Sequence, residues 1–234
     1  MMFSKLPDHV AITLDGNRRW ADAHNIPRKL GIRYGIKKTE EIMYDWTARF
    51  EKEFGVKPFS ELTIHALTLQ NMGRPKEQID ELTDAFVETF SNARLNKKYQ
   101  NVRVVFGGEK HLLREDLQME MSLLENATKE FTKYRFNVCI AYDGLAEIER
   151  AVKIAKDFPY KDITAKDLMY FPEAKPIDLY IRTSGEKRLS NFMLFYIGYA
   201  EMFFVDSLAE DFTYDQFIEV MDEYANKRQR RFGK

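Results

Sequence analysis

Short apolar runs alternate with longer amphipathic segments along the chain of 234 residues. The longer segments carry apolar residues at helical spacing, as at Ile79, Leu82, Phe86 and Phe90, and similar stripes predict helices over 32–54, 148–155 and 217–224. The apolar runs predict strands, and they cover 9–14, 62–67, 102–106, 136–141, 179–182 and 203–205.

This alternation of strands and helices predicts an α/β fold with a mostly parallel central sheet of about six strands, covered by helices on both faces. The sequence contains no internal repeat, low-complexity segment or long linker, so we expect a single domain over 1–234. In such sheets, ligands bind beyond the carboxyl ends of the strands. Candidate functional residues should therefore follow the predicted strands.

Composition narrows the function classes. A net charge of −1 gives the whole molecule no attraction to nucleic acid, so we expect no nucleic-acid partner. The single cysteine, Cys139, excludes a disulfide framework and a cysteine-based metal site, which favours a reducing, cytoplasmic location. Residues 1–7 are too few and too mixed for a signal peptide, and no apolar run reaches the ~18 residues that span a bilayer.

The first predicted strand runs directly into a charged motif, Asp15-Gly16-Asn17-Arg18-Arg19-Trp20-Ala21. Gly16 permits a sharp turn, and Asn17 is expected to cap a following helix, whose free amides and positive end would attract an anion. The two arginines add donors for phosphate oxygens. A carboxylate beside a phosphate needs a cation between them, and Mg²⁺ is often bound by one carboxylate plus substrate phosphates. The alternative interpretation is an ordinary Asp-Gly turn before a basic helix.

A second polar motif, 181–191, follows the fifth predicted strand. It contains two arginines, three hydroxyl side chains, a lysine and a glycine, and predicts a second anion-binding loop. Ser190 or Asn191 is expected to cap the next helix, and Glu186 is expected to orient an arginine. The alternative is a solvated polar loop, but two such loops at the strand ends of one sheet strengthen the anion-binding interpretation of each.

These two motifs resemble those of the cis-prenyltransferases, the undecaprenyl diphosphate synthase family. The segment 9–21 resembles the opening motif of that family, and 181–201 resembles its late motif, ending in Tyr199-Ala200-Glu201. The closing Arg230-Arg231-Phe232-Gly233 is also similar. The resemblance implies a Mg²⁺-dependent enzyme that joins isopentenyl diphosphate to an allylic prenyl diphosphate and forms a cis-polyprenyl diphosphate. It also implies a homodimer and peripheral contact with a membrane for product release.

The resemblance assigns roles by motif match. Asp15 is the implied Mg²⁺ ligand, and Glu201 is implied to complete the metal site, with a dimer interface as one way to bring it there. Asn71 and Arg74 fall in a segment that resembles the flexible lid of the family. The implied catalytic residues are Asp15, Asn17 and Asn71. The implied substrate-binding residues are Gly16, Arg18, Arg19, Trp20, Arg28 and Arg74, and, for the incoming five-carbon unit, Arg182, Arg188 and Ser190.

Three segments depart from the family pattern. Ile32 stands where a histidine is usual. The lid reads Thr68-Leu69-Gln70-Asn71-Met72 instead of Ser-x-Glu-Asn-Trp, and Ala141-Tyr142-Asp143-Gly144-Leu145 replaces Asn-Tyr-Gly-Gly-Arg. The departures leave proton removal and the acceptor open. The acceptor could instead be an alcohol or a second allylic diphosphate, or the chain could be a weakly active partner subunit of a prenyltransferase complex.

Two further sets of side chains have alternative interpretations. Phe86 and Phe90 are expected either to line an apolar tunnel for the prenyl tail or to pack in the core. His24, His65 and His111 lack the spacing of metal ligands and are interpreted as surface or core histidines. A generic nucleotide-binding protein is disfavoured because no phosphate-loop or dinucleotide fingerprint is present.

Overall fold

The computed structural model describes residues 3–96, 100–157 and 162–227. The predicted closing motif, Arg230-Arg231-Phe232-Gly233, lies outside the described residues. Within them, all strand pairings of the central sheet are parallel, which confirms the predicted sheet. The strand order is β3-β4-β2-β1-β5-β6. The strands are β1 (His9–Thr13), β2 (Glu61–His65), β3 (Val102–Gly107), β4 (Tyr134–Cys139), β5 (Leu179–Arg182) and β6 (Glu201–Phe204).

The helices follow the predicted stripes. The segment 32–54 is not one regular helix, because a π-helical turn, Glu41–Trp46, joins α2 to α3 and carries the buried Ile42, Met43 and Trp46. The α-helices are α1 (Asn17–Ala23), α2 (Arg28–Glu40), α3 (Thr47–Phe54), α4 (Lys76–Leu95), α5 (Glu115–Thr128), α6 (Gly144–Asp157) and α7 (Tyr214–Lys227). None of the described helices is long and apolar enough to cross a membrane.

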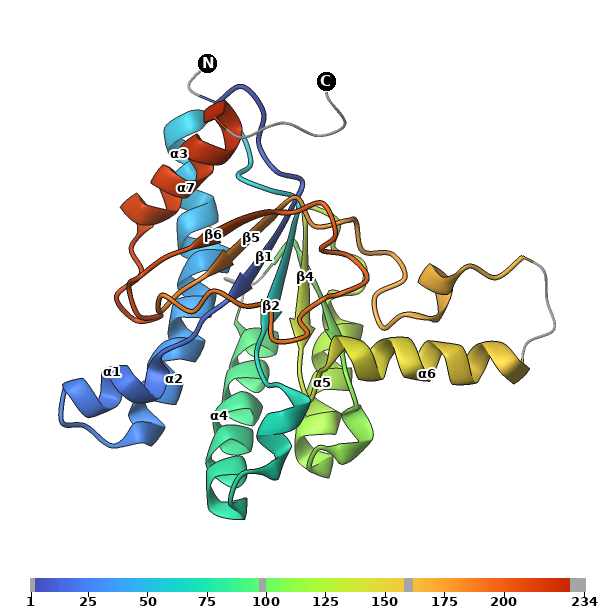
Figure 1. Ribbon diagram of the computed structural model, residues 1–234. Coiled ribbons are helices and arrows are strands. Elements are labelled where there is room, and N and C mark those ends of the chain that lie inside the picture. The colour runs from blue at the N-terminus through green and yellow to red at the C-terminus, as the bar shows by residue number, and fades with distance from the viewer. Residues whose placement is uncertain (1–2, 97–99, 158–161, 228–234) are drawn as a thin grey trace.

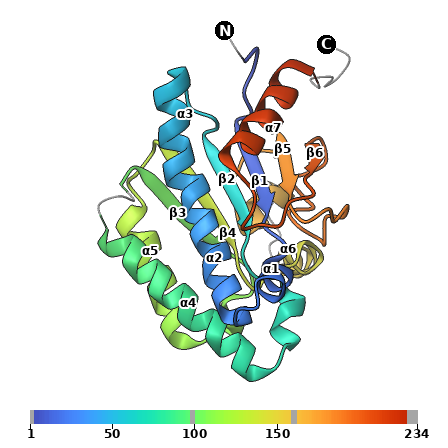
Figure 2. The same ribbon diagram turned by 90° about the vertical axis from the view of Figure 1, so that its left-hand side faces the viewer.

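Side chains that alternate along the strands divide the core into two layers. On β1, Val10 and Ile12 belong to the larger cluster, whereas Ala11 belongs to the smaller one. The larger layer lies under α2, α3, α4, α5 and α7, which cover one face of the sheet (Figures 1 and 2). The opposite face carries α6 and irregular segments, including that of Phe192. Helices thus lie on both faces, as predicted, but unevenly.

The carboxyl ends of three neighbouring strands meet at one edge of the sheet. Thr13 is paired with Arg182 across β1 and β5, and Ile12 is paired with Ile64 across β1 and β2. The segments that follow β1, β2 and β5 are therefore brought together, although they are far apart in the sequence. They contain both predicted anion-binding motifs and the predicted lid.

Candidate active site

The loop after β1 is held rigidly against β5. The hydroxyl of Thr183 accepts a hydrogen bond from the Asp15 backbone N–H at 2.8 Å and donates to the Asp15 carbonyl at 2.9 Å. Gly16 has a φ of 110°, and a Cβ atom there would lie 2.7 Å from the Leu208 side chain. The sharp turn predicted at Gly16 is confirmed, and Asp15, which precedes it, lines a cavity.

Asn17 does not cap α1, so that prediction is wrong. The helix begins at Asn17 itself, and Gly16 occupies the capping position in the left-handed conformation. The Asn17 side chain is directed toward α2 instead and lines a cavity, where its Oδ1 atom is buried without a hydrogen-bond partner in the described structure. An unpaired buried oxygen is costly unless a ligand satisfies it, which supports a binding role for Asn17.

We expect Gly35→Ala to impair activity without destabilising the protein. A Cβ atom on Gly35 would lie 2.3 Å from Asn17 Nδ2, so the amide must move. Alanine is nevertheless the better helix former, by about 1 kcal/mol. We expect kcat/KM to fall about tenfold or more, because a shift of about 1 Å in a positioning group is that costly, with an unchanged or raised melting temperature. Gly198→Ala is the control, since no atom lies within 4 Å of the added Cβ. Equal activities of the two variants would contradict the role of Asn17.

Arg182 connects the two predicted anion-binding loops. Its side chain is buried, and its Nη2 atom donates to Asp15 Oδ2 at 2.9 Å. Its Nη1 atom donates to Ser190 Oγ at 2.9 Å and to the Arg188 carbonyl at 2.5 Å, while Nε is buried and unpaired in the described structure. The guanidinium therefore fixes the loop after β5 against the Asp15 loop and keeps one donor for a ligand.

The prediction that Ser190 or Asn191 caps a helix is wrong. Residues 190–196 form turns, and both residues have positive φ angles, 53° and 57°. Ser190 instead accepts from Arg182, and the Asn191 amide donates to Asp143 Oδ2 at 2.9 Å. The polar side chains that looked like caps in the sequence hold the loop in place through side-chain contacts.

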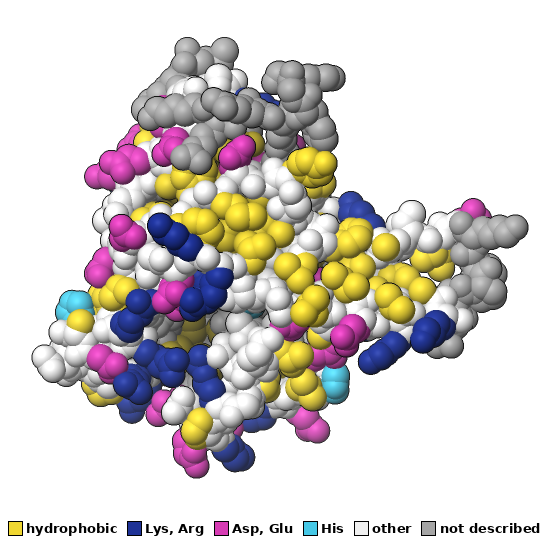
Figure 3. Space-filling view, in the orientation of Figure 1, with side chains coloured by type: hydrophobic (Ala, Val, Ile, Leu, Met, Phe, Trp, Pro, Cys, Tyr) yellow, Lys and Arg dark blue, Asp and Glu magenta, His cyan; other side chains and the backbone are white. Residues whose placement is uncertain are grey.

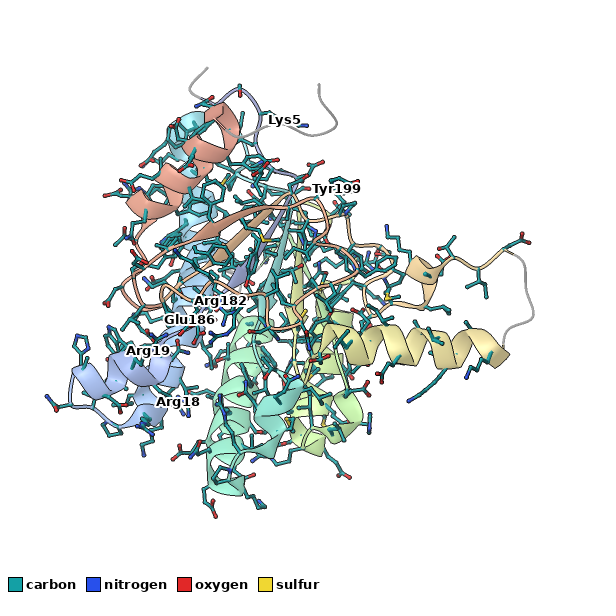
Figure 4. The ribbon with its side chains drawn as sticks, in the orientation of Figure 1. Lys5, Arg18, Arg19, Arg182, Glu186 and Tyr199 are labelled. Carbon is teal, nitrogen blue, oxygen red and sulfur yellow. The ribbon has the colours of Figure 1, made fainter. Side chains whose placement is uncertain are left out.

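Positive side chains gather around this edge. Figure 4 shows Arg18 and Arg19 of α1 on the same side of the molecule as Arg182 and Glu186, and Figure 3 shows lysine and arginine side chains clustered in that region. Glu186 pairs with Arg19 at 3.6 Å and also with Arg188, which confirms its predicted orienting role. The cavity lining includes two carboxylates, Asp15 and Glu40, but five arginines: Arg18, Arg19, Arg74, Arg182 and Arg188.

Arg74 reaches the cavity from the lid. Burial and the nearby Arg18 lower the pKa of Arg74, and Asp15 partly offsets them. A half-buried guanidinium repelled by a second one favours an anion between them. The excess of positive charge therefore suits a ligand with several negative charges, such as a diphosphate.

The interior of the cavity is apolar. Its volume is about 620 Å³, and it extends from the arginines to the space between α2, α4 and the sheet. Phe86 and Phe90 both line it and also belong to the larger core cluster, so both interpretations offered by the sequence apply, and their rings are stacked with centroids 5.7 Å apart. Further apolar side chains complete the lining: Ile32, Ile36, Leu67, Leu82, Ala93, Val104, Leu124, Phe136 and Val138. A hydrocarbon chain attached to a charged group would fit this combination of mouth and interior.

The lid contains a short 3₁₀ helix, Leu69–Gly73, capped by the Thr68 side chain. Gln70 and Asn71 line the cavity, and Gln70 Nε2 donates to Asp143 Oδ2 at 2.5 Å. Burial tends to raise the pKa of Asp143, but hydrogen bonds from Asn191, Gln70 and the backbone outweigh it and lower the pKa. Two departures from the family pattern therefore contact each other, since a neutral amide can donate to a carboxylate that a glutamate would repel.

His65 is not merely a core histidine, because it lines the cavity at the end of β2. Its ring is stacked on Phe192 at 4.6 Å with an interplanar angle of 8°, and its Nε2 atom is buried and unpaired among the described residues. Burial, with a smaller contribution from Arg182, lowers the pKa of His65 to about 4. The sequence did not single out this residue, because the predicted strand 62–67 places it within the strand, whereas β2 ends at His65 in the structure.

This pKa predicts a pH-dependent stability. The folded-state pKa of His65 lies below its unfolded value of 6.5, so the unfolded chain binds more protons between these values, and stability falls as pH drops from 6.5 toward 4. The loss due to His65 is at most about 3 kcal/mol. We expect denaturant unfolding of His65→Phe to lack that part of the loss. Parallel stability curves for the two proteins over this pH range would contradict it.

Three residues implied by the resemblance do not join the cavity within one chain. Arg28 is exposed and pairs with Asp22 at 2.9 Å, and Trp20 Nε1 donates to Asp211 at 2.9 Å. Glu201 begins β6, opposite Leu179, and so lies at the amino ends of the strands rather than beside Asp15. In Figure 4, the neighbouring Tyr199 accordingly lies well away from Arg18.

Metal ligands are correspondingly few. Within the described parts of the chain, no group of three or more histidine, cysteine or acidic side chains could hold a metal ion. The cavity lining contains two carboxylates, Asp15 and Glu40, and close to Asp15 in the sequence it contains the unpaired amide oxygen Oδ1 of Asn17. Such a small set of hard oxygen ligands fits Mg²⁺, which usually keeps several waters and substrate phosphates as ligands.

Comparisons with known proteins identify the family of the chain. The family model of undecaprenyl diphosphate synthase matches residues 13–233. The tritrans,polycis-undecaprenyl-diphosphate synthase (geranylgeranyl-diphosphate specific) of Pyrococcus horikoshii is 38% identical, covering 98% of this chain and 88% of the relative. An isoprenyl transferase of Aquifex aeolicus is 35% identical, covering 100% and 98%.

Solved structures give the same result. The crystal structure of lavandulyl diphosphate synthase from Lavandula x intermedia, in complex with dimethylallyl diphosphate, superposes with a TM-score of 0.81 at 26% identity. The match covers 95% of this chain and 96% of that one. The fold and the relatives agree, and the chain belongs to the undecaprenyl diphosphate synthase family of prenyltransferases.

Proposed function

We propose that the protein uses Mg²⁺ to ionise an allylic prenyl diphosphate and couples it to isopentenyl diphosphate, giving a cis-polyprenyl diphosphate. The observation that carries this proposal is the direct contact of Arg182 with Asp15 at the mouth of an apolar cavity. This contact brings two anion-binding loops together, and two loops suit two diphosphates. The apolar interior suits the prenyl tail, whose burial contributes ~0.8 kcal/mol per CH₂.

Asp15 and Asn17 would hold Mg²⁺, which when bound neutralises charge on the departing diphosphate. Arg18, Arg19 and Arg74 bind the allylic diphosphate through charge-assisted hydrogen bonds and stabilise the charge that develops as its C–O bond breaks. They are well placed for this, because all three line the mouth of the cavity.

The second diphosphate belongs to the loop after β5. Arg182, Arg188 and Ser190 would bind isopentenyl diphosphate there, because Arg182 already connects the other two residues to the Asp15 loop. Holding both substrates side by side removes much of the entropic cost of a bimolecular reaction. Asn71 would act from the lid, above the same mouth.

We also propose that the protein is a cytoplasmic homodimer. Phe195, Tyr199 and Met202 expose 40%, 67% and 36% of their surface next to Glu201, and such apolar side chains are more typical of an interface than of a free surface. A dimer gives Glu201 a route to a metal site that it lacks within one chain. Peripheral membrane contact would help to release the apolar product.

Product analysis tests this function. Purified protein is incubated with geranylgeranyl diphosphate, which the name of one relative contains, or with dimethylallyl diphosphate, which is bound in the lavandulyl diphosphate synthase structure. Each incubation is run with and without ¹³C-labelled isopentenyl diphosphate. We expect products that grow by labelled five-carbon units in Mg²⁺ and no turnover in excess EDTA. Products without the label would point to an alcohol or a second allylic diphosphate as acceptor. Protein that is inactive with all substrates would contradict the proposal and favour a partner-subunit role.

A further inference from the structure

We propose that Nε2 of His65 accepts the proton that isopentenyl diphosphate loses when the new double bond forms. This inference rests on the proposed function and adds a catalytic residue to it. The chain carries Ile32 where the family usually has a histidine, and the Ile32 side chain belongs to the apolar part of the cavity. His65 is the one imidazole in the described lining, and it comes from a different strand.

The sheet places His65 on the acceptor side of the cavity. Thr13 is paired with Arg182, and the register of β1 with β2 continues from Ile12 and Ile64 to Thr13 and His65. Neighbouring strands lie about 4.8 Å apart, so the Cα atoms of His65 and Arg182 are roughly 10 Å apart. Side chains in one such row point to the same face. An acceptor bound by Arg182 through its diphosphate would therefore extend its five-carbon part toward His65.

The ring of His65 is fixed with one nitrogen available. It is stacked on Phe192, and Tyr142 lies edge-on at 6.1 Å. The nearby Tyr142 backbone raises the pKa of His65, which favours a proton on the ring nitrogen that faces it. Nε2 has no partner in the described structure, so a neutral ring with its proton on the other nitrogen would present the lone pair of Nε2 to a ligand.

The surroundings of His65 disfavour protonation of the resting ring, so the lone pair is available to accept a proton. Burial and Arg182 favour the neutral ring, whereas Asp143 and Asp15 oppose them more weakly. The carboxylate of Asp15 is a poorer candidate for the proton, because one oxygen accepts from Gly16 N–H and the other from Arg182. An unpaired buried acceptor costs about 1–3 kcal/mol, and a role in catalysis explains why the cavity retains one.

The chemical step balances with these groups. The terminal alkene carbon of the acceptor forms a C–C bond with the allylic carbon as diphosphate leaves with the electrons of the C–O bond. This leaves a carbocation at C3 of the acceptor. A C–H bond at the neighbouring C2 then breaks, its electron pair forms the new C2=C3 double bond, and the proton moves to Nε2. A proton next to a carbocation is strongly acidic, so a weak base is sufficient.

The test compares His65→Phe, which retains a stacking ring without Nε2, with the wild type and with His111→Gln. His111 is exposed and lies outside the cavity lining. Rates are measured with geranylgeranyl diphosphate, Mg²⁺ and isopentenyl diphosphate, either unlabelled or deuterated at C2. For His65→Phe we expect kcat to fall about 10²-fold, as loss of a general base predicts, with KM little changed. The deuterium isotope effect on kcat should rise clearly above the wild-type value, and His111→Gln should match the wild type.

Either of two results would overturn the assignment: a kcat for His65→Phe close to that of the wild type, or a reduced kcat with an unchanged isotope effect, which indicates a structural role. His65→Gln, measured in the same way, replaces His65→Phe if the latter does not fold. A wild-type protein that forms no product from isopentenyl diphosphate would refute the proposed function itself. Normal wild-type turnover with unaffected His65 variants would refute only the assignment of His65.

Discussion

Replacing Asp15 with asparagine should lower kcat/KM by about 10³-fold or more while leaving the protein folded. The amide oxygen can still accept from the Gly16 N–H, as Oδ1 of Asp15 does at 2.8 Å, so the turn is retained. The substitution removes the charge that pairs with Arg182, and with it the charge that we propose binds Mg²⁺. Electrostatic stabilisation of a leaving group is commonly worth this much in rate. Steady-state kinetics over a range of Mg²⁺ concentrations measures the effect.

Asp116→Asn is the matched control for that variant. Asp116 of α5 is exposed, pairs with Arg114, and lies outside the cavity lining. We expect its activity and Mg²⁺ dependence to match the wild type. If Asp15→Asn kept the wild-type rate and Mg²⁺ dependence, the assignment of the metal site to the Asp15 loop would be wrong.

The second large effect is expected for Arg182→Lys. Lysine keeps the positive charge but cannot reproduce the fork that binds Asp15, Ser190 and the Arg188 carbonyl together. We expect kcat/KM for isopentenyl diphosphate to fall about 10²-fold or more, because each lost charge-assisted hydrogen bond costs about 1.5–3 kcal/mol. Binding of the allylic diphosphate, measured by calorimetry, should change less.

Arg114→Lys controls for the loss of a guanidinium. Arg114 forms ion pairs with Asp84 and Asp116 at the surface of the protein, away from the cavity. Surface ion pairs contribute little to stability, so this variant should have wild-type kinetics. Equal losses of allylic and isopentenyl diphosphate binding in Arg182→Lys would contradict the separation of the two substrate sites.

The sequence predicted the fold because its apolar runs have the length and spacing of buried strands. All six runs became strands, with ends shifted by only a few residues; the last, for example, begins at Glu201 instead of 203. The irregular cover of one face was not foreseen. The segment around Ser190, Asn191 and Met193 has positive φ angles at all three residues, and this conformation is set by tertiary contacts rather than by local propensity.

The site was predictable where one motif follows one strand, as at Asp15 and Arg182. It was not predictable where the contact joins distant segments. Gln70 and Asp143 looked like two separate departures from a family pattern, yet they form one hydrogen bond. Likewise, His65 matters because of the face of the sheet to which its side chain points. That face depends on the register of β2 with its neighbouring strands, which the sequence alone does not give.

The most direct test of the account is a crystal structure with Mg²⁺, isopentenyl diphosphate and a non-reactive thiolo analogue of geranylgeranyl diphosphate. We predict one diphosphate at Arg18, Arg19 and Arg74 and the other at Arg182, Arg188 and Ser190, with Mg²⁺ on Asp15. The prenyl tail should run past Phe86 and Phe90. Two diphosphates bound outside this cavity, or a tail that leaves along the surface, would contradict the central claim.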